Sequence, residues 1–325
     1  MDELDRGTIE EILDLAEAFE EVSGRQIPTV PALRGRSVAL MFFEDSTRTR
    51  LSFDTAAKRL SAQTLVFSAS GSSLSKGESL RDTFATIDAM GVDAMVVRHA
   101  CAGVPASATR WTRAAVLNAG DGRHEHPTQA LLDCYTLTRH VGSANLDGLV
   151  VGIVGDVENS RVARSNVAAM SALGATVKLV GPPTLLPRST LGWPVEVCHD
   201  LDDVLGELDV VYVLRLQSER MASHALPSLR EYRARYGIDG ARAARLKPGA
   251  VVMHPGPMNR GVEILPEVAD GPRSLVLDQV TKGVAVRMAV LFLLLGSPAS
   301  EPRALGSTPG APGSARLWPE GARSA

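Results

Sequence analysis

The chain has 325 residues, of which 45% are hydrophobic and 22% are charged. This length favours two domains, and the apolar content is sufficient for two hydrophobic cores. The formal net charge of −3 excludes an overall positive field of the kind that attracts nucleic acid or anionic lipid, so any anion binding must be local.

The three cysteines, Cys101, Cys134 and Cys198, are widely spaced and form no metal-ligand pattern. We interpret them as buried thiols in a reducing compartment, without a disulfide framework or a metal site. The N-terminus lacks the basic segment and apolar run of a secretory signal, and the apolar stretch 288–295 is too short to span a bilayer. The sequence therefore predicts a cytoplasmic protein that binds neither membrane nor nucleic acid.

The first half of the chain alternates short apolar runs with helical patterns. Thr8 and Glu11 have the spacing of a capping box, which predicts that the first helix begins near Thr8. Continuous apolar runs are typical of strands that are covered on both faces. The predicted strands are 38–43, 65–67, 94–97 and 114–117, and the predicted helices are 53–60, 80–87 and one that begins near Pro127.

A cluster of turn-forming residues at 142–148 separates this half from a second one of the same kind. The predicted elements there are strands at 149–154, 176–180, 210–214 and 251–253 and a helix at 162–173. The alternation favours an α/β protein with two doubly wound parallel-sheet domains and the active site in the cleft between them.

The predicted domain boundaries follow from these elements. The first domain covers 1–140, the second covers 147–283, and the C-terminal helix 284–296 is expected to pack back on the first domain. The segment 297–325 is rich in Pro, Gly, Ser and Ala and cannot bury enough apolar area to offset the entropy of ordering. We therefore predict a disordered tail.

Polar residues follow the predicted strands at the ends where open α/β sheets bind ligands. The segment 44–50, Glu-Asp-Ser-Thr-Arg-Thr-Arg, comes directly after strand 38–43 and places hydroxyls, guanidiniums and free N–H groups at a helix N-terminus. Such an end binds phosphate because the N–H groups and the helix dipole both favour an anion. Taken alone, the segment is equally well explained as a capped helix with solvated arginines.

The other strand ends make the anion site the better interpretation. Arg98 follows strand 94–97, and His126 stands at the start of the helix after strand 114–117. In the second half, Arg161 follows the first strand and Arg215 follows strand 210–214. Arginines at strand ends in both halves indicate a cleft for multiply charged anions.

The motifs that are missing restrict the chemistry further. The chain has no nucleophile elbow, no metal-ligand cluster and no Walker loop, and the glycines at 152 and 155 lack dinucleotide-binding spacing. The predicted reaction therefore depends on positioning and electrostatics more than on a protein nucleophile.

Several of these segments together resemble the aspartate and ornithine carbamoyltransferase family. The resemblance runs from about residue 3 to residue 296 and is carried by 46–50 (Ser-Thr-Arg-Thr-Arg), 72–78 (Ser-Ser-Leu-Ser-Lys-Gly-Glu), 97–99 (Val-Arg-His) and 126–129 (His-Pro-Thr-Gln). Arg161, Arg215-x-Gln217 and the segment 254–261 (His-Pro-Gly-Pro-Met-Asn-Arg-Gly) resemble the aspartate branch. An ornithine enzyme is expected to carry a cysteine beside Leu-Pro near His254, and this chain has none.

The resemblance implies transfer of a carbamoyl group from carbamoyl phosphate to L-aspartate, an early step of pyrimidine biosynthesis, and this reaction requires no cofactor. The implied catalytic residues are Arg48, Thr49, Lys76, Arg98 and His126. The implied carbamoyl phosphate ligands are Ser46, Thr47, Arg48, Thr49, Arg98, His126, Gln129, Pro255, Gly256 and Pro257. The implied aspartate ligands are Lys76, Arg161, Arg215 and Gln217.

The family also implies a homotrimer in which Lys76 and one of Ser72 and Ser73 reach the site of a neighbouring subunit. Such a trimer can belong to a larger assembly with regulatory or pathway enzymes. Two alternatives remain open from the sequence. One is a carbamoyltransferase with a different amine acceptor, and the other is a non-catalytic homologue that acts as an assembly partner. The intact residues at every strand end count against the second.

Overall fold

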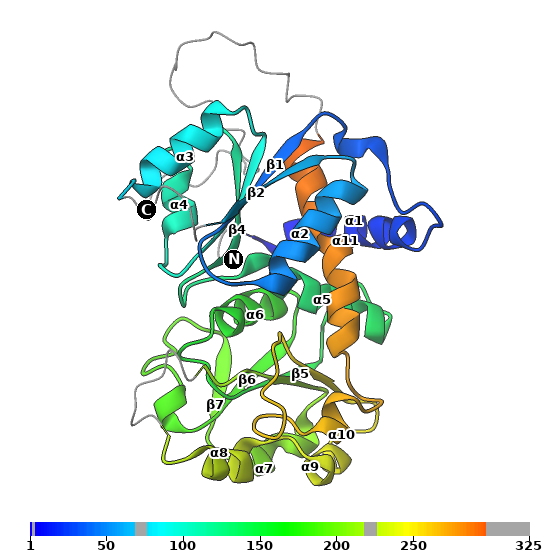
Figure 1. The fold of residues 1–325 in the computed structure, drawn as a ribbon. Helices are drawn as coiled ribbons and strands as arrows, with labels where there is room; N and C mark the ends of the chain where they lie inside the picture. Colours follow the sequence, from blue (N-terminus) through cyan, green and yellow to red (C-terminus); the bar gives the residue numbers. More distant parts are fainter. Residues whose placement is uncertain (2–3, 69–76, 218–225, 297–325) are drawn as a thin grey trace.

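The computed structural model describes residues 1, 4–68, 77–217 and 226–296 of the chain. The predictions for Ser72, Ser73, Lys76 and the tail 297–325 fall outside these residues. The described part is an α/β structure with two parallel sheets, one in each half of the chain, which confirms the predicted fold class (Figure 1).

The first sheet has the strand order β2-β1-β3-β4, and all its neighbouring strands are parallel. Its strands are β1 (Ser37–Phe42), β2 (Gln63–Ser68), β3 (Ala94–His99) and β4 (Ala115–Asp121). The helices of this half are α1 (Arg6–Ser23), α2 (Thr47–Arg59), α3 (Leu80–Ala89), α4 (Val104–Ala108) and α5 (Pro127–Val141), with a 3-10 turn at Pro31–Leu33.

The second sheet has the order β7-β6-β5-β8-β9 and is also parallel throughout. Its strands are β5 (Val150–Val154), β6 (Thr176–Val180), β7 (Val195–Cys198), β8 (Val210–Val213) and β9 (Val251–Met253). Its helices are α6 (Arg161–Ala172), α7 (Leu201–Val204), α8 (Leu229–Tyr236), α9 (Gly240–Arg245) and α10 (Pro266–Ala269), with 3-10 turns at Pro183–Leu185 and Leu205–Glu207. The last helix of the described chain is α11 (Val276–Leu295).

Apolar side chains form three layers around the two sheets. Alternate residues of β1 enter different layers, since Val38 and Leu40 join the layer between the sheets whereas Ala39 and Met41 join the outer layer with α3. A third layer covers the outer face of the second sheet. Because both faces of each sheet are covered, the strands read as continuous apolar runs in the sequence.

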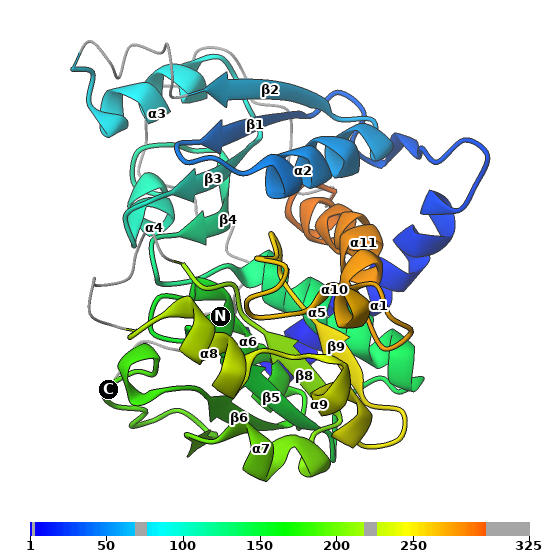
Figure 2. The same cartoon turned by 60° about the horizontal axis from the view of Figure 1, so that its bottom comes forward.

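Helices α5, α6 and α11 lie between the two sheets (Figures 1 and 2). Helix α11 packs against α1, α2 and α5 of the first half and also contacts β9 of the second. It begins at Val276, eight residues before the predicted start. The prediction began too late because the first turns carry the polar residues Asp278, Gln279 and Lys282 and lack an obvious apolar period. No helix in the described ranges is both long and apolar enough to cross a membrane.

The structure differs from the sequence predictions in three smaller features. Helix α1 begins at Arg6, because the Asp5 carboxylate caps it by accepting a hydrogen bond from the Thr8 N–H at 2.8 Å. Strand β7 was missed because it is a four-residue edge strand with two exposed side chains. Of the three cysteines only Cys134 is buried, and Cys101 is exposed.

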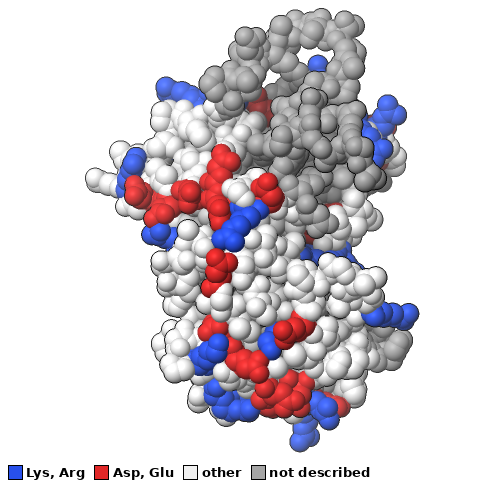
Figure 3. Space-filling model, turned by 180° about the vertical axis from the view of Figure 1, so that it is seen from behind, with Lys and Arg blue, Asp and Glu red and all other residues white. Residues whose placement is uncertain are grey.

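The face opposite to that of Figure 1 carries acidic and basic side chains intermixed over its described part (Figure 3). No extended basic area is visible there. The cationic groups that matter for anion binding lie instead in the cleft between the sheets.

Candidate active site

The strand orders fix where a ligand can bind. Chain order reverses between β1 and β3 in the first sheet and between β5 and β8 in the second. Loops leave such points in opposite directions and open a crevice at the carboxyl ends of the strands. The predicted phosphate segment follows β1, Arg98 is the last residue but one of β3, Arg161 follows β5, and Arg215 follows β8.

These four points line one cleft of about 980 Å³. Every described residue that the sequence assigned to the site is part of its lining: Ser46, Thr47, Arg48, Thr49, Arg98, His126, Gln129, Arg161, Arg215, Gln217, Pro255, Gly256 and Pro257. The two halves of the chain contribute to the lining together, as expected for a site between domains.

The N-terminus of α2 forms one wall of the cleft. Ser46 is its N-cap residue with extended backbone, and its hydroxyl makes no capping hydrogen bond with the first N–H groups of the helix. Residues 46–49 all line the cleft. Partial burial, together with the nearby Arg215 guanidinium, lowers the pKa of Arg48. Two arginines from opposite halves thus repel each other across the cleft, which favours an anion between them.

The turn after β9 closes against Arg48. A Cβ atom at Gly256 would lie 3.0 Å from Arg48 Nε, and the φ angle of +66° there also favours glycine. The Gly256 N–H donates to His254 Nδ1 at 2.8 Å, and the His254 ring lies against the equally buried Glu263. The turn is therefore held in place from inside the second half.

Glu44 joins the two halves at the floor of the cleft. Its carboxylate accepts from Arg98 Nη2 at 2.9 Å and also from Arg161, which comes from the other half of the chain. Gly120 lies under both arginines, since a Cβ atom there would be 3.0 Å from Arg98 Nη1 and 3.1 Å from Arg161 Nε. The sequence interpretation gave neither Glu44 nor Gly120 a role.

His126 is the N-cap residue of α5 and only 4% exposed. Its backbone N–H donates to Ser165 Oγ at 2.9 Å, and its Nδ1 has no hydrogen-bond partner among the described residues. Burial and the cations of Arg98, Arg161 and Arg287 hold the pKa of His126 well below its usual value. The imidazole is therefore neutral and can donate one N–H to a carbonyl oxygen.

The wall from the second half is built around Asp156, which is fully buried after β5. One carboxylate oxygen accepts from the N–H and the amide of Asn159 at 3.2 and 2.8 Å, and the other lies 3.4 Å from the backbone N of Gln217. The Gln217 side chain in turn donates to the Asn159 carbonyl at 3.2 Å. These contacts fix the loop after β8, which carries Arg215, relative to the loop after β5, which leads into α6 at Arg161.

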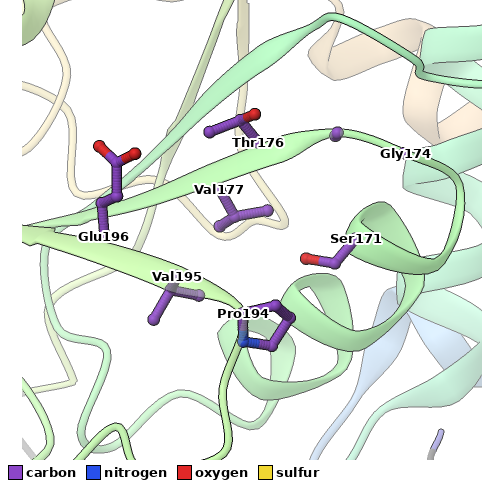
Figure 4. A pocket seen from close by; sticks show the side chains of 8 residues that line it. Ser171, Gly174, Thr176, Val177, Pro194, Val195 and Glu196 are labelled. Atoms are coloured by element: carbon purple, nitrogen blue, oxygen red, sulfur yellow. The ribbon is translucent and has the colours of Figure 1, made fainter.

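A second hollow of about 400 Å³ lies where β6 and β7 begin, beside the end of α6 (Figure 4). This is the amino-end edge of the sheet, away from the switch point. Its one charged lining residue, Glu196, is paired with Lys178 at 3.0 Å. The described residues hold no cluster of His, Cys, Asp and Glu that could bind a metal ion. The cleft between the sheets is therefore the candidate site.

Two family models match the chain. The carbamoyl-P binding domain of aspartate/ornithine carbamoyltransferase matches residues 1–139, and the Asp/Orn binding domain matches residues 147–294. The chain is 58% identical to the aspartate carbamoyltransferase catalytic subunit of Salinispora arenicola over 90% of this chain and 96% of the relative. It is 57% identical to that of Thermobifida fusca over 90% of this chain and 92% of the relative.

Solved structures of aspartate transcarbamoylases have the same fold. The Trypanosoma cruzi enzyme in complex with N-(phosphonacetyl)-L-aspartic acid is 34% identical with a TM-score of 0.82, covering 90% of this chain and 93% of that one. The catalytic subunit from M. jannaschii is 35% identical with a TM-score of 0.81, covering 93% of this chain and 98% of that one. The predicted family resemblance is confirmed.

Proposed function

The chain belongs to the aspartate/ornithine carbamoyltransferase family, and from this we propose that it converts carbamoyl phosphate and L-aspartate into N-carbamoyl-L-aspartate and phosphate. The observation that carries the proposal is the cleft with arginines from both halves, Arg48 and Arg98 on one side and Arg161 and Arg215 on the other. Two anionic substrates buried side by side require such paired cations.

Carbamoyl phosphate occupies the wall formed by the first half. Its phosphate group lies at the N-terminus of α2, where Ser46, Thr47 and Thr49 supply hydroxyls and N–H groups, and Arg98 supplies a guanidinium. The carbonyl oxygen receives hydrogen bonds from Arg48, Thr49 and the neutral His126. Gln129 and the backbone of 255–257 face the amino end of the group.

Aspartate occupies the opposite wall. Arg161, Arg215 and Gln217 take its two carboxylates, and its unprotonated amine attacks the carbonyl carbon. Arg48 and His126 stabilise the tetrahedral oxyanion, the C–O bond to phosphate breaks, and the amine proton leaves with phosphate. Each group in this scheme binds, orients or stabilises charge, and none forms a covalent intermediate.

The direct test supplies the purified chain with carbamoyl phosphate and either aspartate or ornithine and quantifies the carbamoylated products. Aspartate should react far faster, because arginines attract its carboxylates and repel the cationic side chain of ornithine. Comparable rates with ornithine, or product from neither amine, would contradict the proposal. A panel of other amines then tests for a different acceptor.

The finer assignments belong to the same proposal. The first half, 1–140, binds carbamoyl phosphate and 147–283 binds aspartate, in a cytoplasmic homotrimer that acts early in pyrimidine biosynthesis.

Lys76 and Ser72 or Ser73 complete a neighbouring site. Trimers of Lys76→Ala and trimers of Arg98→Ala should therefore each be nearly inactive. After verified subunit exchange, activity should return at up to one site in three, because one site of a hybrid trimer combines an intact Arg98 from one subunit with an intact Lys76 from its neighbour. No recovery would contradict the shared site.

A further inference from the structure

Asp133 is a fully buried carboxylate in α5 that the proposed reaction does not use. It accepts four hydrogen bonds, two on each oxygen. Oδ1 accepts from Gln129 Nε2 at 3.0 Å and from Gln279 Nε2 at 2.7 Å. Oδ2 accepts from Asn166 Nδ2 at 3.0 Å and from the Tyr212 hydroxyl at 2.6 Å. The four donors come from α5, α6, β8 and α11.

The two donors on Oδ1 both lead to the cleft. Gln129 lines it directly, and because its Nε2 donates to Asp133, its carbonyl oxygen points away from Asp133 and can accept a hydrogen bond from a ligand. The side-chain oxygen of Gln279 accepts from the His254 backbone N–H at 3.0 Å, and His254 Nδ1 accepts from the Gly256 N–H at 2.8 Å. One carboxylate oxygen is thus connected to the cleft wall of each half.

The orientation of a glutamine amide depends on its partners, because the oxygen and nitrogen ends differ little in shape. An ionised carboxylate accepts on both oxygens and cannot donate, so it holds the nitrogen end of each glutamine toward itself. Rotating either amide would place two oxygens against each other in a buried space, which costs a desolvated and unpaired acceptor.

We infer that Asp133 is a positioning residue for carbamoyl phosphate, which orients the Gln129 amide and, through Gln279, the turn at 254–256. This inference rests on the proposed function, because it names carbamoyl phosphate as the group that the two walls receive. The Gln129 oxygen is an acceptor for the carbamoyl NH2 group, and the same carboxylate fixes the position of Gly256 against Arg48.

Two substitutions separate the acceptor at Oδ1 from the charge. Asp133→Asn keeps an oxygen that accepts from both glutamines. The Asn166 oxygen has no partner among the described residues, and after the Asn166 side chain rotates it can accept from the new amide. Asp133→Leu keeps the branched outline of the side chain, but its two methyl groups are larger than the oxygens they replace and offer no acceptor. We expect kcat/KM for carbamoyl phosphate to stay within about threefold in Asp133→Asn and to fall about 10- to 100-fold in Asp133→Leu, since small misplacements reduce rates by such factors.

Tyr212→Phe is the matched control, since it removes one hydrogen bond from the Oδ2 side at the same depth. It should lower the melting temperature and leave kcat/KM within about twofold. If Tyr212→Phe and Asp133→Leu lose activity in proportion to their loss of melting temperature, Asp133 serves the fold and the inference is overturned.

A double-mutant cycle tests the connection through Gln129. If Asp133 acts by orienting Gln129, the double variant Gln129→Ala/Asp133→Leu should lose less than the product of the two single losses. Losses that multiply would contradict the inference. Should Asp133→Leu fail to fold, Gln279→Met tests the other arm, because it keeps the carboxylate and removes both hydrogen bonds that lead to His254; an unchanged kcat/KM there would also contradict it.

Binding of carbamoyl phosphate without an acceptor, measured by calorimetry, keeps the two proposals distinguishable. If the wild-type chain binds carbamoyl phosphate but does not carbamoylate aspartate, the acceptor assignment fails and the positioning role of Asp133 is still measured. If wild-type turnover is normal and Asp133→Leu binds and turns over equally well, the positioning role fails and the function stands.

Discussion

The two walls of the cleft hold anions in different ways. The first half offers the N-terminus of α2, where residues 46–49 line the cleft and the Ser46 hydroxyl does not cap the first N–H groups. The second half offers two guanidinium groups, that of Arg161 at the start of α6 and that of Arg215 after β8. The buried Asp156 connects the loops beside them. Converging N–H groups suit a tetrahedral phosphate, whereas planar guanidinium forks suit carboxylates. The difference predicts which kinetic constant each wall controls.

The largest effect is expected from the first wall. Arg48→Ala removes a cation from the carbonyl oxygen on which charge develops, and such donors contribute about 10²- to 10³-fold to kcat. Arg50→Ala is the matched control, because Arg50 lies on the same helix and does not line the cleft. Steady-state kinetics with both substrates should show a fall in kcat for Arg48→Ala alone. A change confined to the KM for aspartate would show that Arg48 belongs to the other wall.

Arg215→Ala should act mainly on aspartate. A lost hydrogen bond from a charged group costs about 1.5–3 kcal/mol, which corresponds to roughly 10- to 150-fold in kcat/KM for aspartate. The affinity for carbamoyl phosphate should change much less, as measured by calorimetry. An unchanged dependence on aspartate concentration would remove Arg215 from the site.

The turn that separates the two walls gives a smaller effect. Gly256→Ala places a methyl group 3.0 Å from Arg48 Nε and should lower kcat about tenfold by displacing that guanidinium. Gly261→Ala is the control, because Gly261 has φ +85° with no atom near its Cβ position. Both variants should lose about 1–2 kcal/mol of stability from the left-handed backbone. Equal activity in the two would show that the contact with Arg48 is unimportant.

Much of this arrangement is present in the local sequence. Each buried strand is an apolar run because both its faces are covered, and polar residues follow at its carboxyl end, so the fold class and the cleft-lining residues could be predicted. What failed depends on tertiary contacts. Strand β4 continues through the polar stretch to Asp121 because it pairs with β3, where His99 lies opposite Asp121.

The residues that join the walls were missed for the same reason. Glu44 pairs with an arginine 117 residues away, and Asp133 meets Gln279 from a helix 146 residues later. No local spacing encodes such pairs. The sequence offers one signal for Asp133, which is an acidic residue among the apolar residues Leu131, Leu132 and Cys134. A carboxylate buried at such a position needs partners, because an unpaired buried charge is costly.

The last expected effect concerns stability and leaves activity nearly unchanged, and it separates the charge of Asp133 from its geometry. Burial raises the pKa of this carboxyl from 3.8 to about 6, although four hydrogen bonds oppose the rise. The folded state therefore binds the proton more tightly than the unfolded chain, so the contribution of this group to stability falls as pH rises from about 4 to about 6. Asparagine does not titrate. At 1.36 kcal/mol per pKa unit, the free energy of unfolding of Asp133→Asn should therefore rise by up to roughly 3 kcal/mol relative to that of the wild type over this window.

The neighbours of Asp133 do not obscure this window. The pKa of Arg287 is lowered to about 10, and burial raises the pKa values of Tyr212 and Cys134, so none of the three titrates between pH 4 and 6. Urea unfolding at pH 4.5 and pH 7.5 is the measurement, and Tyr212→Phe supplies a control that does not remove the titrating group. A relative stability of Asp133→Asn that is the same at both pH values, or lower at pH 7.5, would mean that the carboxylate is fully compensated by its four donors.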